Sequence, residues 1–573
     1  MNDPKRVVWK RWLPVLLCVL VRNVWGLPTE ANPGASTVPG SALPLGDAAS
    51  RGIQSILKEG VHPRLRWSSF PDYQVPLEQL YQGRSYQPIW VQHGNASRQA
   101  RDVIGVLSDA DSQGLSAQDY DAKLLRDWVP RINASTSPQE VALFDVALSV
   151  SVVRYASHLF VGRINPRNVD YGLSIEPKKV DWPNFLYQLA RSTHLREDFA
   201  ALEPKLRLYE DLKAALVRYR ELAGKAESAE LTFPAKFSPG QDHPDVPKLR
   251  KLLATLGELQ LEEAAGDSDT YDQSLAEAVK RFQKRHGVAA DGVIGKSTLA
   301  HLQVPISHRV KQIQLGLERL RWLPEQLGGP YIMVNIPSFE LFGFSDGFAA
   351  GKPDIMMNVI VGEAVDGRRT PVFASDMTYV VFRPHWNLPY KIAVKEMLPG
   401  AMRNPGYLPR HNIEIVSGFG PNSPVYAPTA QNLQLVSSGA LKLRQRPGPK
   451  NALGLVKFAF PNNNNVYLHS TPNKGLFARA RRDFSHGCIR VADPVGLAEW
   501  VLRNEGEWTR SRIQQAMNGT SPKTVTLSQP IPVYIFYSTV LADDGGRVLF
   551  FEDIYGHDQI LQTLLDKGFP YPA

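Results

Sequence analysis

The spacing of hydrophobic positions changes along the chain from a helical repeat to a strand repeat. Up to about residue 320, hydrophobic residues recur every three or four positions, which is the repeat of helices that bury one face. From Tyr331 onward they alternate with polar residues, which is the repeat of strands that bury one face. A chain of 573 residues is long enough for several domains. The pattern therefore predicts a multidomain α+β protein in which a mostly-β domain follows helical ones.

The first folded region is predicted to be helical and to span residues 51–230. Within it, residues 141–161 form a long apolar run that Asp145, Arg154 and His158 interrupt. A membrane span needs about 20 consecutive, mainly apolar residues with few charges, so we expect a buried core helix here. No residue pattern in this region indicates chemistry, and we expect the region to serve as a scaffold.

A smaller helical unit is predicted at residues 237–304. Two stripes of apolar residues at helical spacing precede an Asp-Gly turn at residues 291–292. A third helix follows, and the side chain of Ser297 or Thr298 is expected to cap it. These elements predict a three-helix bundle, which could be a binding module or only a spacer. Residues 305–327 form a further amphipathic pattern and are predicted to be a connector helix.

The mostly-β domain is predicted to span residues 328–573. Glycine and proline residues separate its strands, and a turn at residues 543–546 joins the last two strands as a hairpin. Residues 391–450 do not fit the strand pattern, because a short helical repeat is followed by a stretch rich in proline, glycine and asparagine. We expect these residues to be a capping insertion that folds over a cleft.

The N-terminus has the pattern of an export signal. Basic residues precede a short apolar run at residues 12–21, and small residues follow near position 26. We therefore predict a signal peptide at residues 1–26, with an uncleaved inner-membrane anchor as the alternative. Residues 27–50 contain several prolines among alanine, glycine and serine and are predicted to be a flexible linker.

Charge and cysteine content narrow the candidate chemistry. The formal net charge of +9 suits substrates that carry carboxylates. No nucleic-acid motif and no basic stripe with interleaved aromatic residues is present, so nucleic acid is not an expected partner. One of the two cysteines, Cys18, lies in the apolar run of the signal. Cys488 therefore has no disulfide partner in the exported chain, and it is either a buried filler or a reactive thiol.

Two sequence segments place candidate chemistry around Cys488. Residues 466–469 alternate in polarity, so that Tyr467 and His469 are expected to share one face of a strand and to point into a common cleft. The second segment is the Ser-His-Gly-Cys sequence that ends at Cys488, where Gly487 lets the backbone come close to a substrate. An activated nucleophile needs a thiol, a nearby base and donors for a developing oxyanion. All three are available here.

The Ser-His-Gly-Cys-Ile-Arg sequence, with a histidine 19 positions before its cysteine, resembles the active-site signature of L,D-transpeptidases. These cysteine enzymes cross-link bacterial peptidoglycan. Residues 446–458 and the following Phe-Pro-Asn and Tyr-Leu-His-Ser-Thr-Pro sequences resemble the large, multidomain periplasmic branch of the family. The Tyr-Gln-Pro-Ile-Trp sequence at residues 86–90 is similar to its helical scaffold domain, and residues 278–287 are similar to a peptidoglycan-binding module. The resemblance thus implies that residues 328–573 are the catalytic domain and that the protein is periplasmic.

The resemblance also implies roles for the catalytic residues. Cys488 would attack the carbonyl next to the terminal D-alanine of a tetrapeptide stem, and His469 would be its general base. The backbone carbonyl of Ser470 would orient the imidazole. The N–H groups of Gly487 and Cys488 would stabilise the oxyanion, with the Tyr467 hydroxyl as a third donor. An amine of a neighbouring stem would resolve the thioester into a 3→3 cross-link, and no cofactor is expected.

Four residues are predicted to bind substrate, and three of them have a structural alternative. Tyr467 and Trp386 would line the cleft, although Trp386 could be an ordinary core residue. Arg490 would bind a substrate carboxylate or form a structural salt bridge. His486 could contact substrate, but a structural role in the turn is the simpler interpretation. A zinc site made of His469, His486 and Cys488 lacks a fourth ligand and a zinc-binding spacing, so no metal is predicted.

Two other functions share these sequence features. A carboxypeptidase or endopeptidase would use the same thioester and admit water in place of the acceptor amine. A non-catalytic wall-binding protein would have lost the active residues, which are intact here. The expected partners are donor and acceptor peptidoglycan stems, with transient contacts to cell-wall synthases. The family resemblance also implies that carbapenem β-lactams acylate Cys488.

Overall fold

The computed structural model describes residues 45–573 except for residues 135–136, 170, 173–177, 226–229, 265–267, 325–326, 347–351, 405, 421 and 569–573. The predicted signal peptide lies outside the described residues, as does most of the predicted linker. Helix α1 (Leu45–Glu59) begins inside the segment that was predicted to be linker. Its residues Ile53 and Leu57 are fully buried in the helical core. The boundary at residue 50 is therefore corrected to one before Leu45, because the helical repeat begins there.

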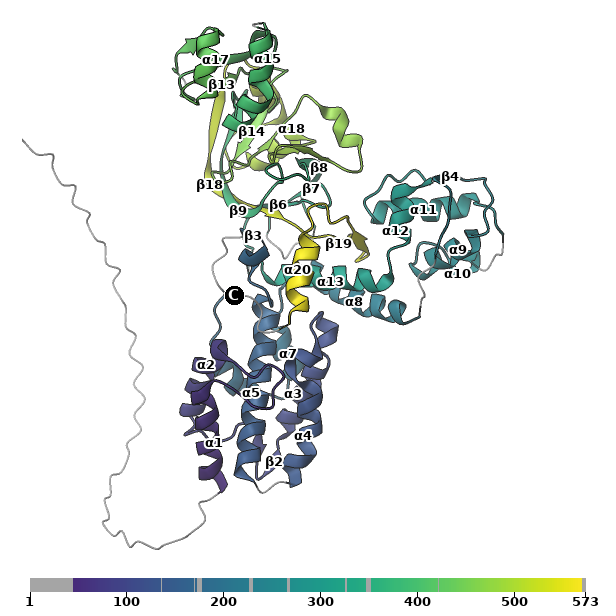
Figure 1. Ribbon diagram of the computed structural model, residues 1–573, viewed down its shortest axis with the longest axis vertical. Helices are drawn as coiled ribbons and strands as arrows, with labels where there is room; N and C mark the ends of the chain where they lie inside the picture. The colour runs from purple at the N-terminus through teal and green to yellow at the C-terminus, as the bar shows by residue number, and fades with distance from the viewer. Residues whose placement is uncertain are drawn as a thin grey trace, which may run out of the picture. The chain divides into compact units, whose positions relative to one another are not determined.

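The N-terminal region is helical, as the hydrophobic spacing predicts (Figure 1). Its principal helices are α1, α2 (Pro71–Gln82), α3 (Arg98–Ser108), α4 (Ala122–Ala134), α5 (Pro138–Val161), α6 (Trp182–Leu189), α7 (Leu195–Ala200) and α8 (Arg207–Lys225). Among the described residues, α5 alone is long and apolar enough to cross a membrane, and 94% of its apolar window is buried inside the protein. Helices α1, α3 and α4 pack around it. The prediction of a buried core helix is confirmed.

The polar residues that interrupt α5 have partners in the core. Asp145 accepts hydrogen bonds from the backbone N–H groups of Ile89 and Trp90, at 2.9 and 2.7 Å. The Tyr81 hydroxyl donates to the same carboxylate at 2.6 Å. Burial raises the pKa of Asp145 to about 6 despite these donors. The carboxylate therefore ties the loop before β1 (Val91–Gln92) to the core helix.

The second helical unit has its own small core. Its elements are α9 (Val246–Thr255), α10 (Leu261–Ala264), α11 (Gln273–Arg285), α12 (Lys296–Leu302) and the short strands β4 (Lys236–Phe237) and β5 (Ile294–Gly295). Leu249, Leu275 and Phe282 are buried together, as their spacing predicts. The predicted cap is wrong, because Gly295 is the N-cap of α12. Thr298 lies inside the helix, and its hydroxyl accepts a hydrogen bond from the buried Gln283 amide at 3.1 Å.

The predicted connector segment forms helix α13 (Ile306–Arg321). Its apolar residues share a core with α8 and with the hairpin of β19 (Val540–Ala542) and β20 (Val548–Phe550). On another face, the fully buried Glu318 accepts hydrogen bonds from Arg163 Nε at 3.2 Å and from the Ile164 N–H at 3.1 Å. The helix is therefore held by buried polar contacts as well as by apolar packing.

The C-terminal region contains a mixed β-sheet (Figure 1). Its strands are β6 (Tyr331–Asn335), β7 (Glu340–Phe344), β8 (Ile355–Gly362), β9 (Val372–Phe382), β14 (Val456–Ala459), β15 (Leu468–His469), β17 (Ile489–Val491) and β18 (Lys523–Phe536). The strand order is β14-β15-β17-β8-β7-β6-β18-β9, and β9 also pairs with β14. The sheet therefore closes on itself. Strands β3 (Tyr171–Gly172) and β16 (Asp483–Ser485) pair outside this ring, with β9 and β8.

Helices complete the C-terminal region. They are α18 (Pro494–Val501), α19 (Arg510–Met517) and α20 (His557–Asp566). The carboxylate of Asp493 caps α18 by accepting a hydrogen bond from the Gly496 N–H at 2.9 Å. Apolar residues from α18, α19 and α20 join the core of the sheet, among them Leu497, Ile513 and Leu561. The predicted α+β fold, with its mostly-β final domain, is confirmed.

The segment that broke the strand pattern folds into a subdomain with its own core. It contains α14 (Tyr390–Ile392), a π-helix (Ala393–Met397), α15 (Leu398–Arg403), α16 (Tyr407–Arg410), α17 (Ala430–Ser437) and the strands β10 (Trp386–Asn387), β11 (Ile413–Val416), β12 (Val425–Tyr426) and β13 (Lys442–Gln445). The strand order is β10-β13-β11-β12. Because Trp386 pairs with Gln445, this capping subdomain begins at residue 386 and not at residue 391.

Buried histidines predict that acid destabilises the fold. Burial lowers the pKa of His62 to about 4 and that of His301 to about 4. The unfolded chain therefore takes up protons below about pH 6.5 that the folded chain does not bind, so stability should fall between about pH 6.5 and 4. Asp145 acts in the opposite sense, because its pKa is raised. We expect the urea midpoint to fall over this pH range.

His62→Gln isolates one imidazole. Glutamine cannot titrate, and its amide can donate a hydrogen bond to the Leu143 carbonyl, which His62 Nε2 contacts at 2.9 Å. The urea midpoint of this variant should therefore depend less steeply on pH than that of the wild type. Equal slopes for the two proteins would contradict the assignment.

Candidate active site

Strand β15 lies between β14 and β17 and brings the two sequence segments together. It pairs antiparallel with β14 and parallel with β17. In this register His469 is the Cα partner of both Lys457 and Arg490. Directly paired residues project from the same face of a sheet. A histidine flanked by two cations therefore occupies one row across three strands.

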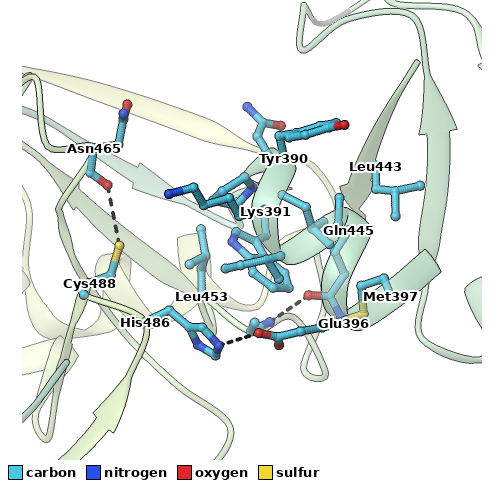
Figure 2. A pocket seen from close by; sticks show the side chains of 18 of the residues that line it. Tyr390, Lys391, Glu396, Met397, Leu443, Gln445, Leu453, Asn465, His486 and Cys488 are labelled. Atoms are coloured by element: carbon cyan, nitrogen blue, oxygen red, sulfur yellow. Dashed lines mark hydrogen bonds and ion pairs between the residues drawn. The ribbon is translucent and has the colours of Figure 1, made fainter. Parts of the chain in front are cut away.

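The predicted site residues line a single cavity of about 1340 Å³. Tyr467 and His469 both face it, which agrees with the predicted alternation along their strand. The other predicted residues that line it are Trp386, His486, Gly487, Cys488 and Arg490. The capping subdomain supplies the opposite wall, where Tyr390, Lys391 and Met397 are seen in Figure 2. Of the predicted site residues, only Ser470 does not line the cavity.

Ser470 instead acts through its backbone, which is the role predicted for it. Its carbonyl accepts a hydrogen bond from His469 Nδ1 at 2.5 Å. With the Nδ1 proton donated to a carbonyl, Nε2 is the basic nitrogen of the neutral ring. The Tyr467 ring lies across the imidazole, with 5.7 Å between the ring centroids. These contacts fix the orientation of His469.

His469 is kept neutral by its surroundings. The residue is 4% exposed. Burial is the main cause that lowers its pKa to about 3, and the nearby charges of Arg490 and Lys457 act in the same direction. The carbonyls of Ser470 and Leu453 oppose this effect only in part. At neutral pH the imidazole is therefore an available base and not an imidazolium.

The Cys488 thiol is half-buried and is also neutral in the resting state. Its Sγ lies 3.6 Å from the backbone carbonyl of Asn465, toward which it donates a hydrogen bond (Figure 2). Burial raises the pKa of Cys488, while hydrogen bonds from Tyr467 and the charges of Lys457 and Arg490 oppose the increase. Within the described residues, no hydrogen bond joins the thiol to His469. Proton transfer between them therefore requires the thiol to leave the Asn465 carbonyl.

The nucleophile turn corrects one predicted oxyanion donor. Gly487 has a φ of +113°, a conformation that favours glycine. Its backbone N–H donates to Ser485 Oγ at 3.2 Å, and the Ser485 hydroxyl in turn donates to the Cys488 carbonyl. The Gly487 N–H is thus engaged inside the turn. The N–H of Cys488 and the hydroxyl of Tyr467 remain the candidate donors.

Thr370 holds this turn through a side-chain hydrogen bond, and no sequence pattern marks it. The Thr370 hydroxyl donates to the Gly487 carbonyl at 2.8 Å and accepts from the Gly362 N–H at 2.8 Å. The Tyr555 hydroxyl donates to the Gly362 carbonyl at 2.6 Å and accepts from the Thr370 N–H at 3.2 Å. All of these contacts are buried, and they fix the end of β8 against the nucleophile turn.

Another glycine, Gly454, supports the histidine and was also missed. It has a φ of +62°, and a Cβ placed there would lie 2.6 Å from Ser470 Oγ and 2.7 Å from the backbone N of Thr471. Such distances are shorter than real contacts allow, so only glycine fits. The backbone that carries the Ser470 carbonyl is therefore packed directly against Gly454.

His486 links the nucleophile turn to the capping subdomain. Its Nε2 lies 2.8 Å from Glu396 Oε1 on the π-helix (Figure 2). Arg368 donates to the same carboxylate oxygen at 3.1 Å and to Glu363 at 2.7 Å. These contacts favour the structural interpretation of His486. A direct contact between His486 and substrate stays a prediction.

Trp386 and Arg490 lie on opposite walls of the cavity. Trp386 belongs to β10, and its interaction with the Tyr467 side chain lowers the pKa of that hydroxyl, which connects the capping subdomain to the catalytic face. Arg490 lies 3.5 Å from the carbonyl of Phe484 through Nη2. No carboxylate pairs with Arg490 among the described residues, so the structural salt bridge considered for it is absent there. Its role as a carboxylate ligand stays a prediction.

The arrangement does not form a metal site. Among the described residues, no group of three His, Cys, Asp or Glu side chains is placed to hold a metal ion. His486 is directed to Glu396, whereas His469 is bound to its neighbouring carbonyl. The zinc alternative for these histidines and Cys488 therefore has no geometric support.

A half-buried thiol in the turn before β17 and a neutral imidazole on the adjacent β15 line one cavity and define a candidate thiol–imidazole catalytic site. Comparison with known families agrees with this class. Residues 329–535 match the model of the L,D-transpeptidase catalytic domain. Residues 76–216 match the scaffold domain, and residues 242–302 match a provisionally defined peptidoglycan-binding domain. The chain therefore contains an L,D-transpeptidase catalytic domain together with these two domains, and the resemblance seen in the sequence is confirmed.

Individual proteins were also compared with the chain. A Haemophilus influenzae protein, provisionally named an L,D-transpeptidase, is 32% identical over 254 residues, which are 44% of this chain and 49% of that protein. The chain thus spans about half the length of this curated relative. An L,D-transpeptidase structure from Xylanimonas cellulosilytica is 15% identical, with a TM-score of 0.16, over 54% of this chain and 100% of that one. A second, from Stackebrandtia nassauensis, is 16% identical, with a TM-score of 0.21, over 53% and 97%.

Replacing Thr370 tests the support of the nucleophile turn. Thr370→Val has nearly the same shape but leaves the Gly362 N–H and the Gly487 carbonyl without their partner. An unpaired buried polar group costs about 1–3 kcal/mol, so we expect a lower melting temperature and slower alkylation of Cys488 by iodoacetamide. Thr370→Ser keeps the hydroxyl and should alkylate like the wild type. Equal behaviour of the valine variant and the wild type would rule out this support.

Replacing Gly454 tests the support of the histidine. Gly454→Ala should displace the Ser470 carbonyl and rotate the imidazole. Misplacing a catalytic group by about 1 Å can cost roughly 100-fold in rate, so we expect Cys488 alkylation at pH 7 to slow at least 10-fold. Gly475→Ala is the matched control, because a Cβ at Gly475 meets no atom within 4 Å. The explanation is wrong if both alanine variants react alike.

Proposed function

We propose that the protein is a peptidoglycan L,D-transpeptidase that forms 3→3 cross-links through a thioester on Cys488. The observation that carries the proposal is the pairing of β15 with β17, together with the single cavity that both the neutral His469 and the Cys488 thiol line. The match to the L,D-transpeptidase catalytic domain supports the reaction class. The match to a peptidoglycan-binding domain supports the substrate.

The first half of the proposed reaction forms the acyl-enzyme. His469 Nε2 takes the proton of the thiol as Cys488 Sγ attacks the carbonyl carbon that precedes the terminal D-alanine. The carbonyl oxygen becomes an oxyanion, which the Cys488 N–H and the Tyr467 hydroxyl stabilise. The carbon–nitrogen bond then breaks, and the imidazolium gives its proton to the leaving amine. D-Alanine departs, and a thioester remains.

The second half of the reaction uses the same groups. The amine of a neighbouring stem attacks the thioester carbonyl, and His469 accepts a proton from that nitrogen. The carbon–sulfur bond breaks, the new amide is released, and the thiolate recovers its proton from His469. The basic form of His469 needed in both halves is the form that burial and the adjacent cations favour.

The lining of the cavity suits an anionic peptide. The Lys and Arg side chains that line it belong to Arg368, Arg369, Lys391, Lys395, Lys442, Lys457 and Arg490. The Asp and Glu side chains belong to Asp366 and Glu396. Stem peptides carry carboxylates at the terminal D-amino acid, and this excess of cations would attract them. Arg490, which lies near the thiol, is the proposed ligand of one such carboxylate.

The proposed location follows from the substrate. Domains that act on peptidoglycan indicate an extracytoplasmic protein. We propose the periplasm, with export by the N-terminal signal. Transient contacts with cell-wall synthases and acylation by carbapenems, whose strained ring carbonyl offers the thiolate an acyl donor, are part of the same proposal.

One assay tests the reaction and separates its alternatives. The purified protein is incubated with disaccharide-tetrapeptides, and the products are identified by mass. Cross-linked dimers with released D-alanine are expected. Tripeptides alone would instead show the carboxypeptidase, and unchanged substrate would indicate a wall-binding protein.

The nucleophile is tested in the same assay. Cys488→Ala and Cys488→Ser should form no detectable acyl-enzyme by intact-mass analysis, because neither offers a thiolate. His469→Gln should reduce the rate at least 100-fold, since it removes the base. His308→Gln replaces an exposed histidine on α13 and should retain the wild-type rate. Acylation of Cys488→Ala would show that another residue is the nucleophile.

A further inference from the structure

Lys457 lies beside the catalytic pair, and no role has been assigned to it. It is on β14, directly opposite His469 in the register of the sheet, and it lines the cavity. Its Nζ is 4.0 Å from the centroid of the Tyr467 ring, close enough for a cation–π contact. Lys457 therefore touches the residue whose hydroxyl faces the thiol.

The charge of Lys457 has no anionic partner in the part of the chain that the structure describes. No salt bridge and no hydrogen bond is formed by its ammonium there, although the side chain is half-buried. A partly buried, unpaired cation costs free energy. An anion that forms nearby during the reaction would offset this free-energy cost. The anion that forms beside Tyr467 is the Cys488 thiolate or the oxyanion that follows it.

Lys457 and Arg490 act on the catalytic pair from two sides. Both cations disfavour an imidazolium at His469, and both favour a thiolate at Cys488. The positive charges of Lys457 and Arg490 therefore favour the loss of a proton from Cys488 and His469 taken together, and they disfavour a protonated His469. This direction suits the step in which the imidazole passes its proton to the leaving amine.

Other titratable groups also surround the thiol. Tyr467 directly precedes β15, and Glu363 follows β8 and acts on Arg490. His486, Glu396 and Arg368 interact with one another at the capping subdomain. Lys457 is thus the cation on the β14 side of the pair, and Arg490 is the cation on the β17 side.

We propose that Lys457 is a positioning residue for the reaction, which holds the Tyr467 ring over the thiol and supplies a positive charge that promotes thiolate formation at Cys488. This proposal rests on the proposed function, because it takes Cys488 as the nucleophile. Methionine is unbranched like lysine, so Met at this position preserves the apolar bulk and removes the charge.

The test is the pH dependence of Cys488 alkylation by iodoacetamide, which follows the thiolate. In Lys457→Met the midpoint should rise by about 0.5–1 pH unit, because a charge roughly two strands away acts through a partly screened medium. Lys457→Arg keeps the charge and should retain the wild-type midpoint. Iodoacetate is an anion, whereas iodoacetamide is neutral. The rate of Cys488 alkylation by iodoacetate should therefore fall several-fold more in Lys457→Met than the rate of alkylation by iodoacetamide.

Lys523→Met is the matched control. Lys523 also lies over an aromatic ring, with its Nζ 4.8 Å from the Trp508 centroid, but it does not line the cavity. The midpoint of Cys488 alkylation in Lys523→Met should equal that of the wild type. The proposal is overturned if the midpoint of Lys457→Met stays within about 0.2 unit of the wild type, or if Lys523→Met shifts it equally.

If thermal melting shows that Lys457→Met is not folded, Lys457→Gln is measured in its place with the same expected shift. The alkylation assay needs no peptidoglycan fragment. The expected shift for Lys457→Met can therefore be absent while cross-linked products are observed, or present while only tripeptides form. The two results test the role of Lys457 and the proposed function separately.

Discussion

The parallel pairing of β15 with β17 is the constraint on which the candidate site depends. The Ile489 N–H donates to the Tyr467 carbonyl at 3.1 Å, and Leu468 is the Cα partner of Ile489. Both of these apolar residues are fully buried, so the register is fixed by the core. A shift of one residue would turn His469 into the core and remove it from the cavity. The same register of β15 with β17 therefore determines both the packing of the sheet and the geometry of the candidate catalytic pair.

Burial sets the protonation state of that pair. It raises the pKa of Cys488 and lowers the pKa of His469, so both groups are neutral before substrate arrives. A resting ion pair is thus not the state that this structure favours, which refines the simple expectation of a thiolate made by its histidine. The thiol points to the Asn465 carbonyl, and the buried imidazole is held by Ser470. Attack and proton transfer are expected to occur together once substrate displaces the thiol from Asn465.

The capping subdomain gives the cavity its second wall while remaining a separate packing unit. Its core includes Leu388, Leu408 and Leu443, and these residues do not belong to the core of the main sheet. Polar contacts join it to the catalytic face, through Glu396 with His486 and through Trp386 with Tyr467. A unit with its own core and few polar contacts to the site is well suited to move as a body when a ligand enters the cavity.

The sequence by itself determined most of the secondary-structure elements and indicated the candidate chemistry of this protein. Local spacing predicted the buried helix α5, the three-helix unit and the strands of the final domain, because amphipathic repeats depend only on neighbouring residues. The Ser-His-Gly-Cys sequence and the histidine before it indicated a candidate nucleophile and base through the chemistry of a thiol and an imidazole and through their resemblance to the L,D-transpeptidase signature.

The tertiary structure alone decided how these parts are supported. Thr370, Gly454 and Lys457 act through partners that are far away in sequence or across the sheet, and no local pattern marks them. The engagement of the Gly487 N–H by Ser485 likewise depends on the folded turn. Hydrogen bonding, burial and charge at a site are set by what the fold brings within a few ångströms, and sequence spacing carries little of that information.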